Sequence, residues 1–184
     1  MLTRIILCGT LAFVSINSLP AYAGINTPIV KQSIKDSNIT KTIEALYSKS
    51  PALQKQSISV ITVEQQVVLA GTLNSNQQYE RALTLASSVL GVNAINADNL
   101  RVRSSKAPLK DTYITAKVKG SFIKEKIFGS KNIELWPITV ETKNSTVHLA
   151  GEVKNLSQRA NLIKIAQAVE GVKKVESDLR IRLS

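Results

Sequence analysis

The 184-residue chain contains a single cysteine, Cys8, which lies near the amino terminus inside a short apolar run. We expect this run to be removed as part of a signal peptide, which would leave the mature protein without a thiol. Such a protein can form neither a disulfide nor a thiolate metal site. An exported protein without disulfides depends on its hydrophobic core for stability.

Histidine is equally rare, since His148 is the only one in the chain. Imidazole is a frequent general acid or base and a frequent metal ligand. His148 lies between two apolar residues of a predicted strand, and the corresponding position in the repeat described below is Val68. No paired carboxylates recur at the strand ends, and the isolated glycines make no phosphate loop. We therefore predict a protein that is not an enzyme, with no catalytic residues, no metal and no cofactor.

Long hydrophobic runs are absent apart from residues 5–16, which are too few to span a bilayer. Arg4 before this run and Ala21-Tyr22-Ala23 after it complete the pattern of a secretory signal peptide. We predict cleavage after Ala23 and export to the periplasm. Cys8 lies too early in the run to carry a lipid anchor, so we expect a soluble exported protein.

Negative charge is scarce, with 13 acidic residues against 24 lysines and arginines, a net charge of +11. Most of the excess lies in residues 104–184, which hold 15 basic and 8 acidic side chains. An exported cationic protein meets anionic lipid or cell-wall polymer rather than nucleic acid. The alternative is that the charge serves only solubility.

The chain uses one segment twice, at a constant spacing. Residues 67–92 (VVLAGTLNSNQQYERALTLASSVLGV) correspond to residues 147–172 (VHLAGEVKNLSQRANLIKIAQAVEGV). Gly71 thus matches Gly151, and Gly91 matches Gly171. The first glycine of each pair lets the chain leave a strand, and the second is expected to end a helix in a left-handed conformation. These four glycines are predicted to be structural.

The same order of elements is predicted around both copies. A helix capped by Asp36 or Asp111 precedes an antiparallel hairpin. A second helix then opens with a capping pattern, Ser75-x-x-Gln78 in the first copy, and a third strand follows. The first copy has one additional residue between 96 and 99, which predicts a β-bulge.

The expected fold class is α+β, with two tandem α-β-β-α-β domains. Each domain should hold a three-stranded mixed sheet with two helices on one face, because a strand–helix–strand crossover makes the third strand parallel to the second. The expected boundaries are a signal peptide at 1–23, an extended N-terminal arm at 24–35, a first domain at 36–103, a linker at 104–110 and a second domain at 111–184.

This order of elements resembles the BON domain. The residues that carry the resemblance are Val67-Val68-Leu69-Ala70-Gly71 with Gly91-Val92, and their counterparts from Val147 to Gly151 with Gly171-Val172. The resemblance covers residues 32–184 in two copies. It implies binding roles at phospholipid surfaces and in envelope maintenance, without chemistry.

The resemblance further implies that the first helix of the second domain faces the membrane. The candidate lipid-binding residues on this helix are Tyr113, Lys117, Lys119, Lys124 and Lys126. A tyrosine suits an interface because its ring is apolar and its tip polar. The alternative is a solvated helix face with ordinary lysines.

A second candidate surface is the open face of the second sheet. Strand alternation should display Arg180, Arg182 and His148 there, as a site for anionic surfaces or for domain docking. The alternative is the ordinary polar outer face of a sheet.

Together with the signal peptide, the resemblance implies a non-enzymatic, periplasmic protein of envelope and osmotic stress protection. Its expected partner is an anionic phospholipid surface, bound peripherally and mainly through the second domain, and envelope proteins are further candidates. The competing hypothesis is a chaperone-like or scaffold module that binds other proteins by strand addition to an open sheet edge.

Overall fold

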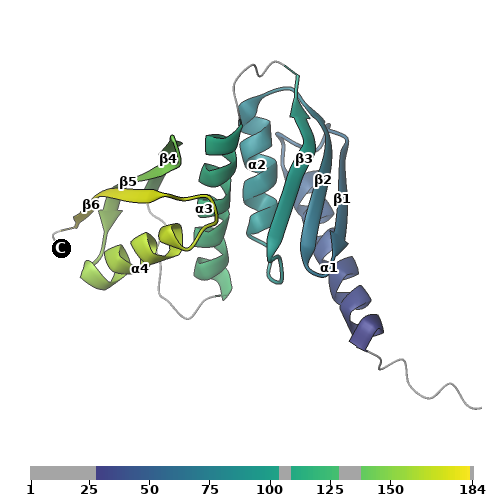
Figure 1. Ribbon diagram of the computed structural model, residues 1–184, viewed down its shortest axis with the longest axis horizontal. Coiled ribbons are helices and arrows are strands. Elements are labelled where there is room, and N and C mark those ends of the chain that lie inside the picture. The colour runs from purple at the N-terminus through teal and green to yellow at the C-terminus, as the bar shows by residue number, and fades with distance from the viewer. Residues whose placement is uncertain (1–27, 104–108, 129–137, 183–184) are drawn as a thin grey trace, which may run out of the picture.

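The computed structural model describes residues 28–103, 109–128 and 138–182. The predicted signal peptide and its cleavage site after Ala23 lie outside these residues, as does most of the linker. Figure 1 shows the elements in order: α1 (Pro28–Lys49), β1 (Ile58–Val63), β2 (Gln66–Leu73), α2 (Asn76–Ser87), β3 (Ala94–Val102), α3 (Lys110–Phe128), β4 (Ile138–Lys143), β5 (Thr146–Val153), α4 (Leu156–Gln167) and β6 (Lys174–Ile181).

Each repeat forms one three-stranded mixed sheet. In the first sheet β2 lies between an antiparallel β1 and a parallel β3, and in the second β5 lies between an antiparallel β4 and a parallel β6. The predicted α+β architecture with two α-β-β-α-β repeats is therefore confirmed. The predicted bulge is confirmed as well, because Val68 pairs with Asn96 while Ala70 pairs with Asn99.

Both hairpins turn through two residues with positive φ. Glu64 and Gln65 have φ values of 50° and 65°, and Asn144 and Ser145 have values of 52° and 63°. Positive φ at both central residues is the pattern of a type I′ turn, whose twist matches that of the flanking strands. Each turn therefore holds two non-glycine residues in the left-handed region, a conformation that needs support from neighbouring residues.

A carboxylate on the first helix of each domain supplies this support. Asp36 accepts hydrogen bonds from the backbone N–H groups of Glu64 and Gln65, at 2.8 and 2.9 Å. Asp111 does the same for Asn144 and Ser145, at 2.7 and 2.9 Å. The aspartates thus fasten the helix to the hairpin turn in both repeats.

The prediction that Asp36 caps its helix is wrong. The helix begins eight residues earlier at Pro28, a residue suited to the first helical turn, and residues 28–35 are helical rather than an extended arm. Asp111 likewise lies just inside α3, which begins at Lys110. The spacing correctly indicated that the two aspartates are equivalent in the repeat. Their side chains, however, accept from the N–H groups of the hairpin turns and not from those of a helix N-terminus.

Removing the Asp36 carboxylate should therefore destabilise the first domain. We expect Asp36→Ala to lower the free energy of unfolding by about 2–4 kcal/mol, because two charge-assisted hydrogen bonds are lost from a buried side chain. Urea titration would measure this. Glu44→Ala removes an exposed carboxylate from the same helix and should change stability by less than about 0.5 kcal/mol. Equal effects of the two substitutions would contradict the tethering role.

The second helices begin where the sequence predicts. The side chains of Ser75 and Asn155 accept hydrogen bonds from the N–H groups of Gln78 and Gln158. In a capping box the glutamine is expected to accept from the backbone N–H of the capping residue, but Gln78 Oε1 accepts from Asn74 N at 2.8 Å. The hydrogen bond to the glutamine side chain therefore comes from the residue that precedes the capping serine.

The four glycines lie in two kinds of place. Gly71 and Gly151 lie inside β2 and β5, which continue to Leu73 and Val153, so the prediction that they let the chain leave the strand is wrong. Gly71 has a φ of 146°, and a Cβ there would lie 2.5 Å from Ser57 O, so the neighbouring backbone requires a glycine. Gly91 has a φ of 92°, but α2 already ends at Ser87. Gly91 and its counterpart Gly171 therefore shape the turn after the helix rather than its last residue.

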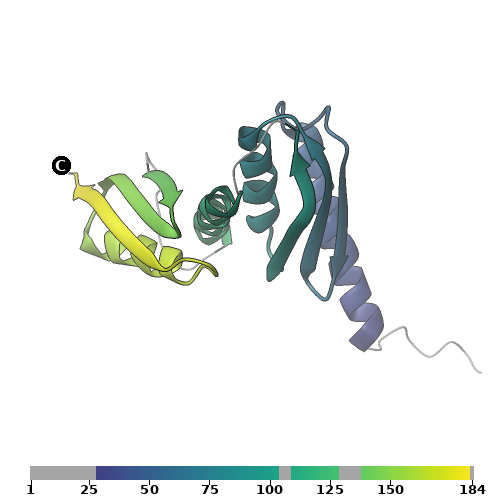
Figure 2. The same cartoon turned by 45° about the horizontal axis from the view of Figure 1, so that its top comes forward.

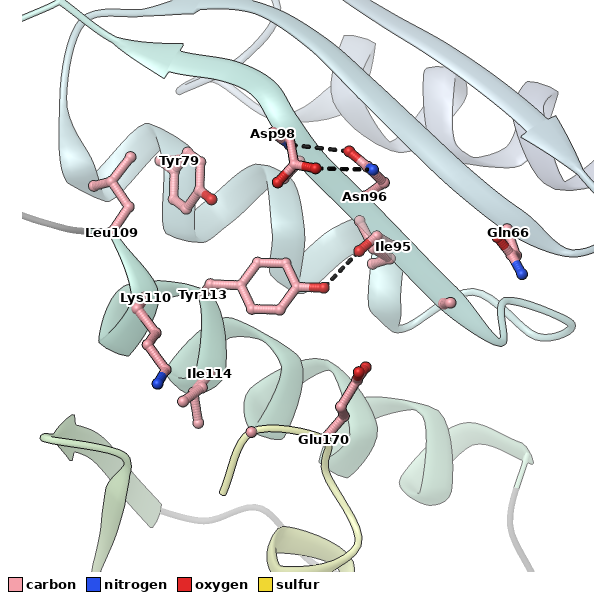
Figure 3. Close-up of a pocket in the computed structure, with 13 residues that line it drawn as sticks. Gln66, Tyr79, Ile95, Asn96, Asp98, Leu109, Lys110, Tyr113, Ile114 and Glu170 are labelled. Atoms are coloured by element: carbon pink, nitrogen blue, oxygen red, sulfur yellow. Dashed lines mark hydrogen bonds between the residues drawn. The ribbon is translucent and has the colours of Figure 1, made fainter. Parts of the chain in front are cut away.

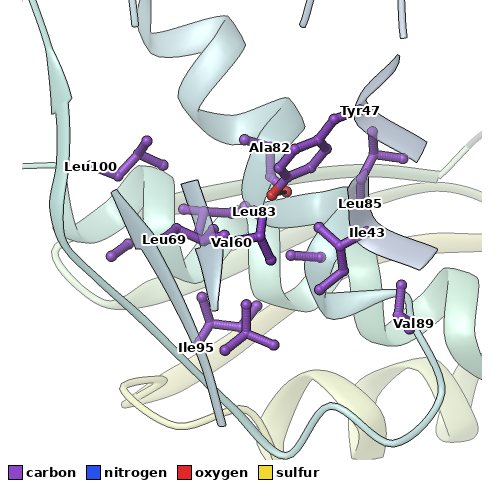
Figure 4. Packing of buried hydrophobic residues seen from close by; sticks show 14 of the residues in the cluster. Ile43, Tyr47, Val60, Leu69, Ala82, Leu83, Leu85, Val89, Ile95 and Leu100 are labelled. Atoms are coloured by element: carbon purple, nitrogen blue, oxygen red, sulfur yellow. Dashed lines mark hydrogen bonds between the residues drawn. The ribbon is translucent and has the colours of Figure 1, made fainter. Parts of the chain in front are cut away.

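Each sheet packs its helices over a separate hydrophobic core. Figure 4 shows the core of the first domain, in which Ile43, Leu69 and Leu83 are completely buried. The Tyr47 hydroxyl donates to Ala82 O at 2.9 Å, which joins α1 to α2, and burial raises the pKa of Tyr47 above its usual range. One member of this core, Ala116, comes from α3 of the second domain.

Candidate functional site at the junction of the domains

Helix α3 belongs to both halves of the molecule. Figures 1 and 2 show it standing between α2 and the sheet formed by β4, β5 and β6. Its side chains Ile114, Val118 and Phe122 are buried in the second core, whereas Ala116 is buried in the first. The domains are thus docked through a helix that both of them share.

A glycine allows α3 to approach α2 closely. A Cβ at Gly120 would lie 1.8 Å from the Ser87 side-chain oxygen and 2.8 Å from Thr84 O. The Ser87 hydroxyl donates to Leu83 O at 2.7 Å, so it is held against its own helix. Any larger residue at position 120 would push the two helices apart.

The repeat provides an internal comparison for this contact. The positions of α1 that correspond to Ala116 and Gly120 hold Lys41 and Ala45, and both are exposed. The positions of α4 that correspond to Thr84 and Ser87 hold Lys164 and Gln167. Small residues therefore occur on both sides of the docked contact, whereas longer side chains stand at most of the undocked counterparts.

Polar groups surround this helix pair. Lys119 Nζ lies 2.6 Å from Glu80 Oε1, and Lys124 Nζ donates to Val92 O at 3.0 Å. The Tyr113 hydroxyl donates to Ile95 O at 2.5 Å. Burial lowers the pKa of the Lys124 ammonium. Three of the five predicted lipid-binding residues are thus used to hold the second domain against the first.

A cleft of about 570 Å³ opens beside this contact, between β3 and the start of α3 (Figure 3). Its charged lining residues are Asp98, Lys110 and Glu170. Tyr79 also lines it, and burial, followed by the nearby Tyr113 and Asp98, raises the pKa of Tyr79 to about 12. The tyrosine is therefore protonated at neutral pH and cannot act as a base there. No histidine or cysteine lines the cleft within the described residues.

The other two lipid-binding candidates differ in their accessibility. Lys117 Nζ lies 3.2 Å from Glu170 Oε2 and 5.1 Å from the centre of the Tyr113 ring, and only 13% of its side chain is exposed. Lys126 is exposed near the end of α3, next to Ile127, which is 62% exposed. The structure therefore gathers Tyr113 and Lys117 at the junction and leaves Lys126 facing solvent.

The open face of the second sheet carries both signs of charge. His148 Nδ1 lies 3.2 Å from Glu176 Oε2, and Arg182 Nε lies 3.2 Å from Glu152 Oε2. Arg180 is exposed and stands opposite Glu152 in the register. A hydrogen bond from Lys174, followed by its charge, lowers the pKa of Glu176. The three candidates point outward as predicted, but acidic neighbours offset their charge.

Neither a metal centre nor a membrane span occurs among the described residues. Across residues 28–103, 109–128 and 138–182, no three histidine, cysteine or acidic side chains are grouped so that they could hold a metal ion. Over the same ranges, no helix combines the length and apolarity needed to cross a bilayer.

Known proteins resemble this chain over most of its length. The model of the family described as "BON domain" matches residues 35–104 and 110–182. The osmotically-inducible protein Y of Escherichia coli (strain K12) is 33% identical over 152 residues, which cover 80% of this chain and 73% of that protein.

Two solved structures of CdsD, a structural protein of the type III secretion system of Chlamydia trachomatis, are more distant. The first, a C-terminal domain, is 14% identical with a TM-score of 0.31, over 80% of this chain and 67% of that one. The second is 13% identical with a TM-score of 0.34, over 81% and 64%. TM-scores of this size do not establish a shared fold.

Proposed function

Because this chain belongs to the BON-domain family, which it matches in two copies, we propose that it is a non-enzymatic protein of the osmotic stress response in the cell envelope. We further propose that it works in the periplasm and binds anionic phospholipid surfaces, mainly through its second domain. The observation that carries the stress role is the 33% identity to the osmotically-inducible protein Y.

The distribution of charge supports a lipid surface as the partner. The half of the chain after residue 103 holds 15 basic and 8 acidic residues. A lysine close to an anionic bilayer contributes about 1 kcal/mol to binding, and an adjacent apolar side chain can enter the headgroup region. Lys126 with Ile127 combines both properties at one end of α3.

The docked arrangement limits what α3 can offer to a membrane. Tyr113, Lys119 and Lys124 make their contacts with the first domain, so they can meet lipid only when α3 leaves α2. In the proposed mechanism Lys126 makes the first contact, and separation of the domains then adds the remaining residues. Docking and full lipid binding would compete for the same helix.

Vesicle co-sedimentation tests the proposal. We expect the mature protein to bind phosphatidylglycerol vesicles and not phosphatidylcholine vesicles, with binding weakened by salt. Lys126→Gln should weaken binding roughly fivefold, the equivalent of one interfacial lysine. Lys49→Gln, which removes an exposed lysine from α1, should have little effect. Equal binding to both vesicle types, or equal effects of the two substitutions, would contradict lipid binding through the second domain.

Glu80 offers a further test of the competition. Glu80→Gln removes the partner of Lys119 across the junction and raises the net charge by one, and Glu44→Gln makes the same change of charge at an exposed position of α1. If docking and lipid binding compete, Glu80→Gln should bind anionic vesicles more tightly than Glu44→Gln. Equal binding by the two variants would show that α3 is not released.

A further inference from the structure

Two large apolar side chains are exposed at one end of the second domain. Leu156, the first residue of α4, is 67% exposed, and Ile181, the last residue of β6, is 41% exposed. Ile181 is paired with Val153 across the sheet, and Leu156 follows Val153 by three residues. Val153 itself is buried in the second core. The two exposed side chains therefore extend this core to the surface of the domain.

This end of the second domain is remote from its contact with the first domain. The residues that follow α4, Glu170 and Gly171, line the junction cleft. A helix of 12 residues is about 18 Å long, so the start of α4 lies well away from the junction. Figure 1 shows the start of α4 and the end of β6 on the side of the second domain that faces away from α2. A partner that binds there need not separate the domains.

Basic residues surround the two apolar side chains. Residues 153–159 and 179–182 hold no acidic residue and four basic ones, which are Lys154, Arg159, Arg180 and Arg182. All four are exposed except Arg159, which is half-buried. The nearest acidic residues along the chain are Glu152 and Asp178, and Glu152 Oε2 lies 3.2 Å from Arg182 Nε. This end of the domain therefore has a positive charge.

The same end of the first domain lacks the lysine and the leucine. Asn74 and Asn76 stand where the second domain has Lys154 and Leu156. In both repeats the helix nevertheless begins at this point with the same kind of cap. The fold therefore requires neither side chain. A lysine two residues from an exposed leucine suits a partner that is both anionic and apolar.

We propose that this surface, formed by Lys154, Leu156, Ile181 and Arg182 and called the distal end below, contacts an anionic phospholipid bilayer while the domains stay docked. The inference rests on the proposed lipid binding and adds a second contact to that of Lys126. The two apolar side chains enter the headgroup region, and the basic side chains bind the lipid phosphates. A net charge of +11 favours the approach of the protein to such a surface.

Exchange of two residues for their counterparts in the first repeat tests the contact. We expect Leu156→Asn to weaken binding of the mature protein to phosphatidylglycerol vesicles by about tenfold, and Lys154→Asn by about fivefold, in co-sedimentation. Leu90→Asn is the apolar control, because it removes a leucine that is 60% exposed in the first domain. Lys49→Asn removes an exposed lysine from α1. Both controls should bind like the wild type, and circular dichroism verifies that all four variants are folded.

A fluorescent label reports insertion of the distal end directly. Cys8, the one cysteine of the chain, lies in the predicted signal peptide, so Leu156→Cys gives the mature protein a single thiol. An environment-sensitive dye on this thiol should shift its emission to the blue with phosphatidylglycerol vesicles and not with phosphatidylcholine vesicles. The same dye attached through Leu90→Cys should show no shift with either.

Three results would overturn the contact at the distal end. In the first, Leu156→Asn and Lys154→Asn bind phosphatidylglycerol vesicles like the wild type while Lys126→Gln binds more weakly; the lipid binding proposed for the second domain would then stand without this contact. In the second, the dye shifts equally at positions 156 and 90, which would indicate adsorption without a preferred surface. In the third, the wild type binds no phosphatidylglycerol vesicles, which would contradict lipid binding itself.

Discussion

Gly120→Leu is expected to separate α3 from α2 and to lower the free energy of unfolding by about 1–3 kcal/mol or more, the usual range for an overpacked contact. The first added carbon would already lie 1.8 Å from the Ser87 oxygen, and Thr84 O behind it is backbone that cannot rotate away. Thermal unfolding measures the loss of stability, and small-angle scattering measures the separation of the domains.

The sign of the change in the free energy of unfolding shows whether the two helices are docked. Glycine in a helix interior is about 0.8–1.0 kcal/mol less favourable than alanine, and leucine is close to alanine. An undocked α3 would therefore become more stable on Gly120→Leu. Ala45→Leu at the exposed equivalent position of α1 is the control and should change stability by less than about 0.5 kcal/mol. A stabilised Gly120→Leu protein would contradict the docked arrangement.

Leu149→Ala should have a larger effect. Leu149 is 1% exposed at the centre of the second core, and such truncations cost about 2–5 kcal/mol. A domain of this size has only a few kcal/mol of net stability, so the substitution should unfold much of the second domain. Because Ala116 on α3 is part of the first core, we expect amide protection to fall in α2 as well. Residue-resolved hydrogen exchange would detect both losses.

Two comparison variants make this result interpretable. Leu69→Ala truncates the equivalent leucine of the first core, which is completely buried, and should destabilise the first domain by a similar amount. Leu156→Ala truncates a leucine that is 67% exposed on α4 and should have almost no effect. Unchanged protection in α2 after Leu149→Ala would mean that the two domains unfold independently.

The architecture of each repeat was predictable because strong local signals agree with one another. Alternating apolar residues, the caps at Ser75 and Asn155 and the bulge after Asn96 all act within a few residues of each other. The role of Asp36 was not predictable in the same way, because its hydrogen-bond partners Glu64 and Gln65 are brought to it only by the folded hairpin. Spacing along the chain indicates a helix but not what the helix will contact.

The contacts of the lipid-binding candidates could not be predicted from their own helix, because their partners lie in the other domain. Tyr113, Lys119 and Lys124 have the composition of a membrane-facing surface, yet their partners are Ile95, Glu80 and Val92. A signal was nevertheless available in the repeat, since Ala116 and Gly120 replace Lys41 and Ala45 on the corresponding helix. Two reductions in side-chain size four residues apart predict a close helix contact.

The participation of Ala116 in the first core also bears on how the molecule can be divided. A fragment that ends in the linker would retain every strand of the first domain but would lose the cover that Tyr113 and Ala116 of α3 give its core. A fragment that ends after α3 would keep that cover and expose Ile114 and Val118, which face the second core. Either cut leaves apolar surface in water, so this chain of two repeats has to be produced and studied whole.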